Sequence, residues 1–173
     1  MPSPRLLLLF PLLVSLTGCH NENSTRIDYA VGERVPVGAL TYTVVETSWQ
    51  TQLGEGFKIR SPERRFLLVT LSVTNGGGND VSIPLLELEG PGGQTYRELP
   101  DGEGVSNWFG LLRTISPAQT QQGRILFDVS LTSYKLRLTN GDLGTEKIAW
   151  VQLPLRMDTD TQVQAPIPGS AVK

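Results

Sequence analysis

The sequence is poor in the side chains that perform most enzyme chemistry and bind most transition metals. Its 173 residues include one cysteine, one histidine and two methionines. The histidine, His20, directly follows the cysteine, Cys19, in a polar stretch that shows no sign of packing. A general base must be held within about 3 Å of its partner, so we expect no Ser-His-Asp or Cys-His site. Copper sites need clustered Cys, Met or His, and we predict no metal and no cofactor.

Long apolar runs and disulfides are absent as well. A single cysteine cannot form a disulfide within the chain, so the core must hold without covalent cross-links. The apolar run Leu6–Gly18 has thirteen residues and would span roughly 20 Å as a helix, short of the roughly 30 Å hydrocarbon core of a bilayer. Arg5 precedes the run, and small residues end it. This arrangement is typical of a secretory signal peptide rather than of a permanent transmembrane helix.

The end of this run carries a recognisable motif, formed by Leu16, Thr17, Gly18 and Cys19. These residues resemble the lipobox of bacterial lipoproteins, in which the cysteine sulfur is diacylglycerated and the chain is cut before it. The resemblance implies a signal peptide at 1–18 and a mature N-terminus at the cysteine. The alternative is an ordinary signal peptide that ends near a cysteine. Two or more acyl chains on one residue would anchor a protein stably, whereas a single chain would not.

These features predict where the protein resides and how it is organised. We expect an exported protein whose partner is a membrane, held through lipidated Cys19. His20 resembles the permissive signal for outer-membrane sorting, so the protein would face the periplasm from the outer membrane in a host with two membranes. Otherwise it would sit on the outer face of the cell membrane. A flexible tether at 19–28, a folded domain at 29–157 and a flexible tail at 158–173 complete the organisation.

The folded region is dominated by alternation of apolar and polar residues. In Phe66–Asn75, four apolar residues at alternate positions share one face, while Phe66 and Leu68 take the other. In Gly123–Ser130, the pattern points Ile125, Phe127 and Val129 inward and Leu126 outward. The last strand of the series is expected in Lys147–Leu155, with Ile148 and Trp150 on its inward face. This period of two indicates half-buried strands. Further strands are expected at 34–38, 39–49, 81–90, 94–99 and 133–140.

Turn residues separate these strands, and no window sustains a 3.6-residue period. Clusters of Gly, Asn and Asp stand at Asn75–Asp80, Gly90–Gly93 and Asn140–Gly144. Short strands at this spacing predict an all-β fold, an immunoglobulin-like antiparallel β-sandwich of seven or eight strands. Pro84 cannot donate to a strand ladder, so its segment should be an edge strand or carry a break.

Several stretches, taken together and in order, resemble the DUF4352 family of exported and lipid-anchored bacterial proteins. The likeness covers most of Gly32–Leu138 and rests on Gly32–Val44, Phe66–Gly77, Pro84 to Tyr96, and Ile115–Ser130. It implies a telokin-like immunoglobulin fold and brings no catalytic residues. Where the family often has a Pro-Gly turn, this chain has proline followed by Ala118.

Two segments are candidates for recognition of a partner. Gly104–Thr114 contains Trp108, Phe109 and Arg113 without clean alternation, and aromatic residues with arginine on a loop are typical of binding sites. The alternative is that this segment folds back and plugs the open end of the sandwich. The second segment is a basic cluster, which could meet an acidic partner or could equally be a solvated loop; it comprises Lys58, Arg60, Arg64 and Arg65.

The sequence therefore favours a non-enzymatic function. The formal net charge is −2, which argues against nucleic acid or an anionic membrane as the main partner. We expect a lipid-anchored cell-envelope protein whose immunoglobulin-like domain binds another protein or a polymer. A first alternative is an envelope hydrolase that acts on carbohydrate or peptidoglycan through Glu87 and Glu89 or through Asp101 and Glu103. A second is a structural subunit whose edge strand, at Ser82–Leu88, pairs with a partner.

Overall fold

The computed structural model describes residues 27–142 and 144–155, and all of its regular elements are strands. None of the described segments forms a helix long and apolar enough to cross a bilayer. The predicted signal peptide, the lipobox, nearly all of the tether and the predicted tail lie outside the described residues. The strands are β1 (Asp28–Tyr29), β2 (Arg34–Val37), β3 (Leu40–Gln50), β4 (Phe66–Asn75), β5 (Val81–Ser82), β6 (Glu87–Glu89), β7 (Thr95–Arg97), β8 (Thr114–Ile115), β9 (Thr120–Asp128), β10 (Tyr134–Thr139) and β11 (Ile148–Leu153).

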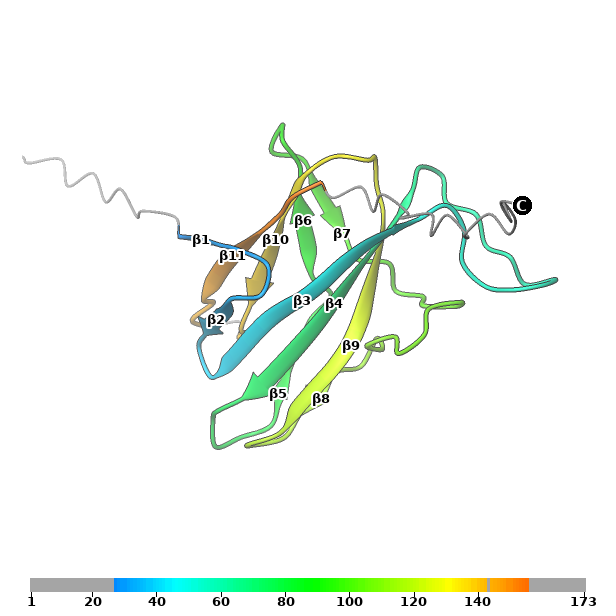
Figure 1. Cartoon of the computed structure of the whole chain (residues 1–173). Coiled ribbons are helices and arrows are strands. Elements are labelled where there is room, and N and C mark those ends of the chain that lie inside the picture. Colours follow the sequence, from blue (N-terminus) through cyan, green and yellow to red (C-terminus); the bar gives the residue numbers. More distant parts are fainter. Residues whose placement is uncertain (1–26, 143, 156–173) are drawn as a thin grey trace, which may run out of the picture.

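Two sheets face each other across the core, and a small third sheet closes one side (Figure 1). The four-stranded sheet has the order β2-β3-β4-β9, and the five-stranded sheet has the order β1-β11-β10-β6-β7. The pair β5-β8 forms the third sheet. Among the named strands, every pair is antiparallel except β1 with β11. The predicted β-sandwich is confirmed, and the strand count exceeds the prediction mainly because three strands have only two residues each.

The main core lies between the two large sheets and follows the alternation of the sequence. On β3, Leu40, Tyr42 and Val44 are fully buried, and the four alternate residues Leu67 to Val73 of β4 meet them. The register between β3 and β4 shifts between Val44 and Glu46. This bulge leaves Val45 exposed, because an extra residue on one strand has no cross-strand partner.

A second, smaller core on the outer face of β4 and β9 corrects one prediction. Phe66, Leu68 and Leu126 were expected to point outward, and the structure buries all three. They form a cluster with Leu53, against which Leu99 and Val105 also pack. Burial of these apolar groups on the outer face follows from the two long connections, 51–65 and 98–113, that fold over this end of the sheet.

Two further details differ from the predicted pattern. In β11 the inward residues are Ala149, Val151 and Leu153, whereas Ile148 is exposed. The prediction of which face of this strand meets the core was therefore wrong. Asp28, assigned to the flexible tether, begins β1, and its carboxylate accepts hydrogen bonds from Lys135 Nζ and Gln152. The break expected at Pro84 is present, because this residue separates β5 from β6, which belong to different sheets.

Candidate functional site

A polar hollow lies at the end of the sandwich where three connections meet. The turn between β2 and β3, the segment leading into β5 and the loop between β10 and β11 border an open hollow of about 510 Å³. We call this the end pocket. Its walls approach closely: a Cβ on Gly141, which has φ of +69°, would stand 2.5 Å from the Ser82 carbonyl oxygen. The lining residues with polar side chains are Asp80, Ser82, Asn140, Asp142, Thr145 and Lys147.

The loop between β10 and β11 is stiffened by its own side chains. Asn140 Oδ1 accepts a hydrogen bond from the Lys147 amide at 2.9 Å, and its Nδ2 donates to the Thr145 carbonyl at 3.2 Å. Asp142 accepts hydrogen bonds from the Gly144 amide at 2.9 Å and the Thr145 hydroxyl at 3.0 Å. The Gly144 bond is the larger cause that lowers the pKa of Asp142 below its usual value, so this carboxylate stays ionised at neutral pH.

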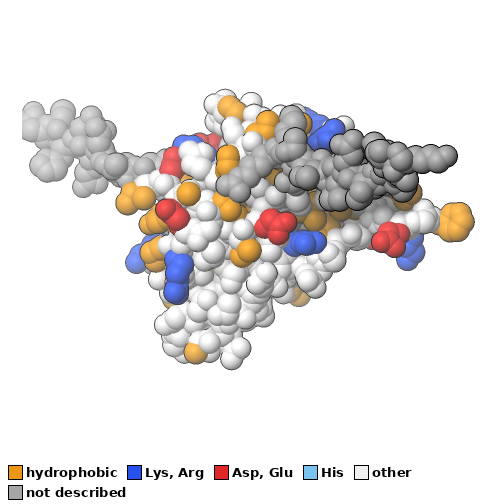
Figure 2. Space-filling view, viewed as in Figure 1, with side chains coloured by type: hydrophobic (Ala, Val, Ile, Leu, Met, Phe, Trp, Pro, Cys, Tyr) orange, Lys and Arg blue, Asp and Glu red, His pale blue; other side chains and the backbone are white. Residues whose placement is uncertain are grey.

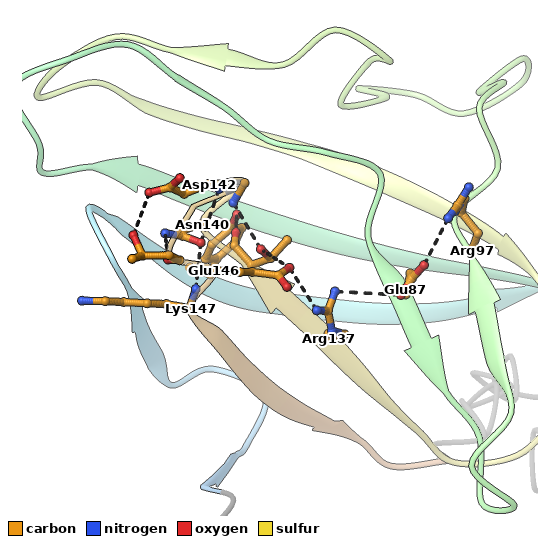
Figure 3. Close-up of polar contacts among 11 residues, drawn as sticks. Glu87, Arg97, Arg137, Asn140, Asp142, Glu146 and Lys147 are labelled. Carbon is orange, nitrogen blue, oxygen red and sulfur yellow. Dashed lines mark hydrogen bonds and ion pairs between the residues drawn. The ribbon is translucent and has the colours of Figure 1, made fainter.

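A chain of ion pairs runs from this loop across the outer face of the five-stranded sheet (Figure 3). Glu146 Oε1 accepts hydrogen bonds from the Thr139 hydroxyl at 2.9 Å and from Arg137 Nη2 at 3.0 Å. Arg137 Nη1 lies 3.9 Å from Glu87 Oε2, and Arg97 Nη2 lies 3.4 Å from Glu87 Oε1. The four charged side chains are partly or largely exposed, so their ion pairs add little stability.

The end pocket offers groups that could recognise a polar ligand. The Asp80 and Asp142 carboxylates are acceptors, the Lys147 ammonium is a donor, and all three are carried by connections held in place by the sheets. Such a set can bind hydroxyl, amine or carboxylate groups of a polar ligand. Within the described ranges, no group of three or more His, Cys, Asp or Glu side chains could hold a metal ion.

The predicted binding segment 104–114 runs back along the four-stranded sheet. The Phe109 amide donates to the Arg124 carbonyl at 2.9 Å, and the Arg124 amide donates to the Asn107 carbonyl at 2.8 Å. Trp108 thus forms a bridge beside β9, while the Phe109 ring packs against the main core. The exposed apolar side chains of this segment are Leu111 and Leu112.

Arg113 is the most deeply placed of the three predicted recognition residues. Its side chain is fully buried, forms an ion pair with the equally buried Glu98, and donates from Nε to the Gly110 carbonyl at 2.6 Å. Its guanidinium lies 5.3 Å from the centre of the Phe109 ring. Burial raises the pKa of Glu98 above its usual value, and the charge of Arg113 opposes this effect. The segment therefore packs back on the sandwich through Phe109 and Arg113, while Leu111 and Leu112 remain exposed.

Two of the four carboxylates proposed for the hydrolase alternative, those of Glu87 and Asp101, are engaged in structural contacts. Glu87 is held by the ion pairs with Arg97 and Arg137. Asp101 forms an ion pair with Arg60 at 3.4 Å and accepts a hydrogen bond from the Glu103 amide at 2.9 Å. Cys19 and the lipobox residues lie outside the described residues.

The sequence analysis did not identify the two glycines that make room for the 104–114 segment to pack against the sandwich. A Cβ on Gly123 would stand 2.5 Å from Phe109 Cδ2, and one on Gly102 would stand 2.1 Å from the Trp108 ring. The missing side chains make room for the two aromatic rings. A glycine within the strand-like stretch Gly123–Ser130 was the available signal, because such a glycine marks close approach of another group.

Two sheets around one apolar core, joined by antiparallel connections, define this chain as a β-sandwich domain of the immunoglobulin-like class. The family model described as Domain of unknown function (DUF4352) matches residues 29–148. The chain belongs to the DUF4352 family. Comparison with curated proteins found no match.

Solved structures with a similar fold come from several bacteria. The yjhA protein of Bacillus subtilis is 15% identical with a TM-score of 0.58, over 72% of this chain and 98% of that one. The ycdA protein of the same organism, a suggested lipoprotein, is 18% identical with a TM-score of 0.58, over 72% of this chain but 39% of its own length. MPT63, a secreted protein of Mycobacterium tuberculosis, is 20% identical with a TM-score of 0.50, over 75% of this chain and 98% of that one.

Proposed function

We propose that the chain is exported, cut before Cys19 and anchored in a membrane by lipid on that residue. The observation that carries this proposal is the motif Leu16–Cys19 at the end of a short apolar run; its cysteine lies nine positions before Asp28, where the sandwich begins. The similar fold of a suggested lipoprotein and of a secreted protein supports it. In this account the sandwich is a non-catalytic module of the cell envelope.

The end pocket is the binding site that the geometry favours for this module. Its three walls are connections fixed by the sheets, and two acidic residues and one lysine are among the residues that line this hollow of about 510 Å³. The ligand would be a polar segment of an envelope protein or polymer that presents hydroxyl, amine or carboxylate groups. Trp108, Phe109 and Arg113, the first candidates from the sequence, would then support the scaffold instead of touching the ligand.

The two alternatives receive less support from the contacts. Ion pairs engage one carboxylate of each pair that a hydrolase would need, Glu87 and Asp101. In the segment proposed as a pairing edge, the Ile83 amide donates to the Arg113 carbonyl at 2.9 Å, and the Leu86 amide donates to Glu98 at 3.1 Å. A partner strand would have to displace these bonds.

The anchor is tested by cell fractionation. Wild-type chain should remain with membranes through high-salt and carbonate washes, and globomycin should block its maturation. A Cys19→Ser variant should appear in the soluble exported fraction. Equal retention of both proteins on membranes would refute the lipid anchor.

The end pocket is tested by capture from solubilised envelope extract and by binding to purified peptidoglycan. A double variant, Asp80→Asn with Lys147→Gln, should capture at least about tenfold less ligand, because each lost charge-assisted hydrogen bond weakens binding. Arg34→Gln, a charge change at an exposed residue of β2 that does not line the end pocket, is the matched control and should bind like the wild type. Unchanged binding by the double variant would assign recognition to another surface.

A further inference from the structure

The connection between β3 and β4 forms a finger that projects from one end of the sandwich (Figure 1). At its base, the Leu53 amide donates to the Arg60 carbonyl at 2.9 Å and the Arg60 amide donates back at 2.8 Å. At its tip, the Lys58 amide donates to the Glu55 carbonyl at 3.1 Å. We call Leu53–Arg60 the β3–β4 finger. Figure 2 shows hydrophobic side-chain atoms at the extreme right of the molecule, where the finger extends in Figure 1.

The finger is fixed at its base, so its tip is held in a defined place. Leu53 belongs to the outer apolar cluster with Phe66. The Arg60 guanidinium lies 5.4 Å from the centre of the Phe66 ring and donates to the Asp101 carbonyl at 3.1 Å. These contacts join the finger to β4 and to the connection that follows β7.

The tip displays apolar groups where none is needed for folding. Phe57 has a relative exposure of 110%, and Ile59 is 53% exposed, with Lys58 between them. Apolar surface left in water is unfavourable, and here two apolar side chains lie together on one projecting tip. A convex tip that carries one aromatic ring and an adjacent lysine suits a fluid lipid surface, because the ring enters the interface while the ammonium stays among the headgroups.

We propose that the β3–β4 finger inserts Phe57 into the interface of the membrane that carries the lipid anchor. The proposal rests on the proposed anchoring through Cys19. Ten residues from Cys19 to Asp28 reach at most roughly 33 Å, so the domain stays near that membrane at an effective concentration of the order of millimolar. A weak contact is then sufficient. Because the chain has a net charge of −2, apolar insertion, rather than attraction to anionic lipid, drives this contact.

Figure 1 places β1 and the finger at opposite ends of the sandwich. Contact through both the tether and the finger therefore lays the long axis of the sandwich along the membrane. A domain held in this way presents the same face to the envelope in every molecule, in contrast to one that swings freely on its tether.

The test uses the lipidated mature chain reconstituted in phosphatidylcholine vesicles. A Phe57→Trp variant reports the environment of the tip, and the emission of the parent is subtracted to remove the three native tryptophans. Leu112→Trp, at a side chain that is 94% exposed outside the finger, is the matched control. Lipids with brominated acyl chains should quench the added emission of Phe57→Trp and leave that of Leu112→Trp unchanged. Water-like, unquenched emission from Phe57→Trp, or equal quenching of both variants, would overturn the proposal.

A second measurement separates the finger from the anchor. With Cys19→Ser, the mature chain carries no lipid, and its weak partition into phosphatidylcholine vesicles can be measured by co-sedimentation at millimolar lipid. Phe57→Ser in this background should lower the partition coefficient about tenfold or more, whereas Leu112→Ser should change it little. If Phe57→Ser has no effect while the wild type remains anchored in cells, the finger proposal fails and the anchor stands. If Cys19→Ser remains on membranes in cells, the anchor itself fails.

Discussion

The Arg113 guanidinium forms an ion pair with the Glu98 carboxylate inside the sandwich, and neither side chain is exposed to solvent. Glu98 also accepts a hydrogen bond from the Leu86 amide at 3.1 Å. Arg113 Nη1 is buried and has no hydrogen-bond partner within the described part of the chain. Transfer of two charges from water to the interior is costly, so this pair specifies how the 104–114 segment closes the sandwich more than it adds net stability.

Breaking this pair should destabilise the protein more than removing both charges. We expect Arg113→Met alone to lower the free energy of unfolding by about 3–5 kcal/mol, because it leaves Glu98 buried without its ion-pair partner. The double variant Glu98→Leu with Arg113→Met should recover most of that loss. Urea unfolding of the single and double variants measures the coupling. Arg97→Met, at an exposed ion pair with Glu87, is the control and should cost under about 1 kcal/mol. Additive effects of the two buried changes would contradict the account.

The turn between β8 and β9 contains a residue in an unfavourable backbone conformation. Ala118 has φ of +59° and follows Pro117, and the Gln119 amide donates to the Ser116 carbonyl at 3.1 Å. A turn with positive φ at its third position favours glycine. We expect Ala118→Gly to raise the free energy of unfolding by about 1 kcal/mol, as measured by urea denaturation. A loss of stability would show that the Ala118 methyl group makes a contact worth more than the backbone strain.

The seat of Phe109 on β9 can be tested by filling it. Gly123→Ala would place a methyl group 2.5 Å from Phe109 Cδ2 and 2.8 Å from its Cα, so the segment must shift. We expect a loss of about 1–3 kcal/mol in the free energy of unfolding and a change in the emission of the neighbouring Trp108. Gly78→Ala has open space around it and serves as the control. Identical unfolding curves for both variants would mean that the 104–114 segment is not packed on β9.

Tyr42 should make the protein sensitive to alkali. Burial raises the pKa of Tyr42 far above its usual value, against an opposing effect of Arg113, and its hydroxyl donates to the Thr139 carbonyl at 2.7 Å. Above pH 10 the unfolded chain releases this proton and the folded chain retains it. The free energy of unfolding therefore falls as pH rises, by up to about 1.4 kcal/mol per pH unit from this group.

Tyr42→Phe isolates that contribution. At pH 7 it should cost about 1 kcal/mol through the lost hydrogen bond, and between pH 10 and 11.5 its stability should fall less steeply than that of the parent. Parallel pH profiles for the two proteins, measured by urea unfolding, would show that Tyr42 ionises equally easily in both states.

The fold was largely predictable because alternation in the sequence reports which strand face meets the core. Tyr134, Leu136 and Leu138 obey this rule, and all three are buried. The rule failed for Leu126 because loops distant in sequence cover the outer face of its strand, and periodicity within one strand carries no information about such a cover. The prediction of the buried face of β11 failed for a similar reason, because the exposed Ile148 is as apolar as the buried Val151 and the alternation gives no clear signal.

The candidate site was less predictable than the fold. Aromatic residues and an arginine on one loop suggested a site for binding a partner. Arg113 instead forms a buried ion pair with Glu98, fifteen positions earlier in the chain. The end pocket combines residues from three separate connections, and nothing in the local sequence of Asp80 or Lys147 indicates that they share a hollow. Such sites depend on which strand ends the topology brings together.

The central claim is that a lipid-bearing cysteine holds this sandwich outside the cytoplasm. Intact-mass spectrometry of the protein purified from membranes tests it most directly. The account predicts a chain that begins at Cys19 and carries the added mass of a diacylglyceryl group on that residue. A chain that begins elsewhere, or that begins at Cys19 with an unmodified thiol, would contradict it.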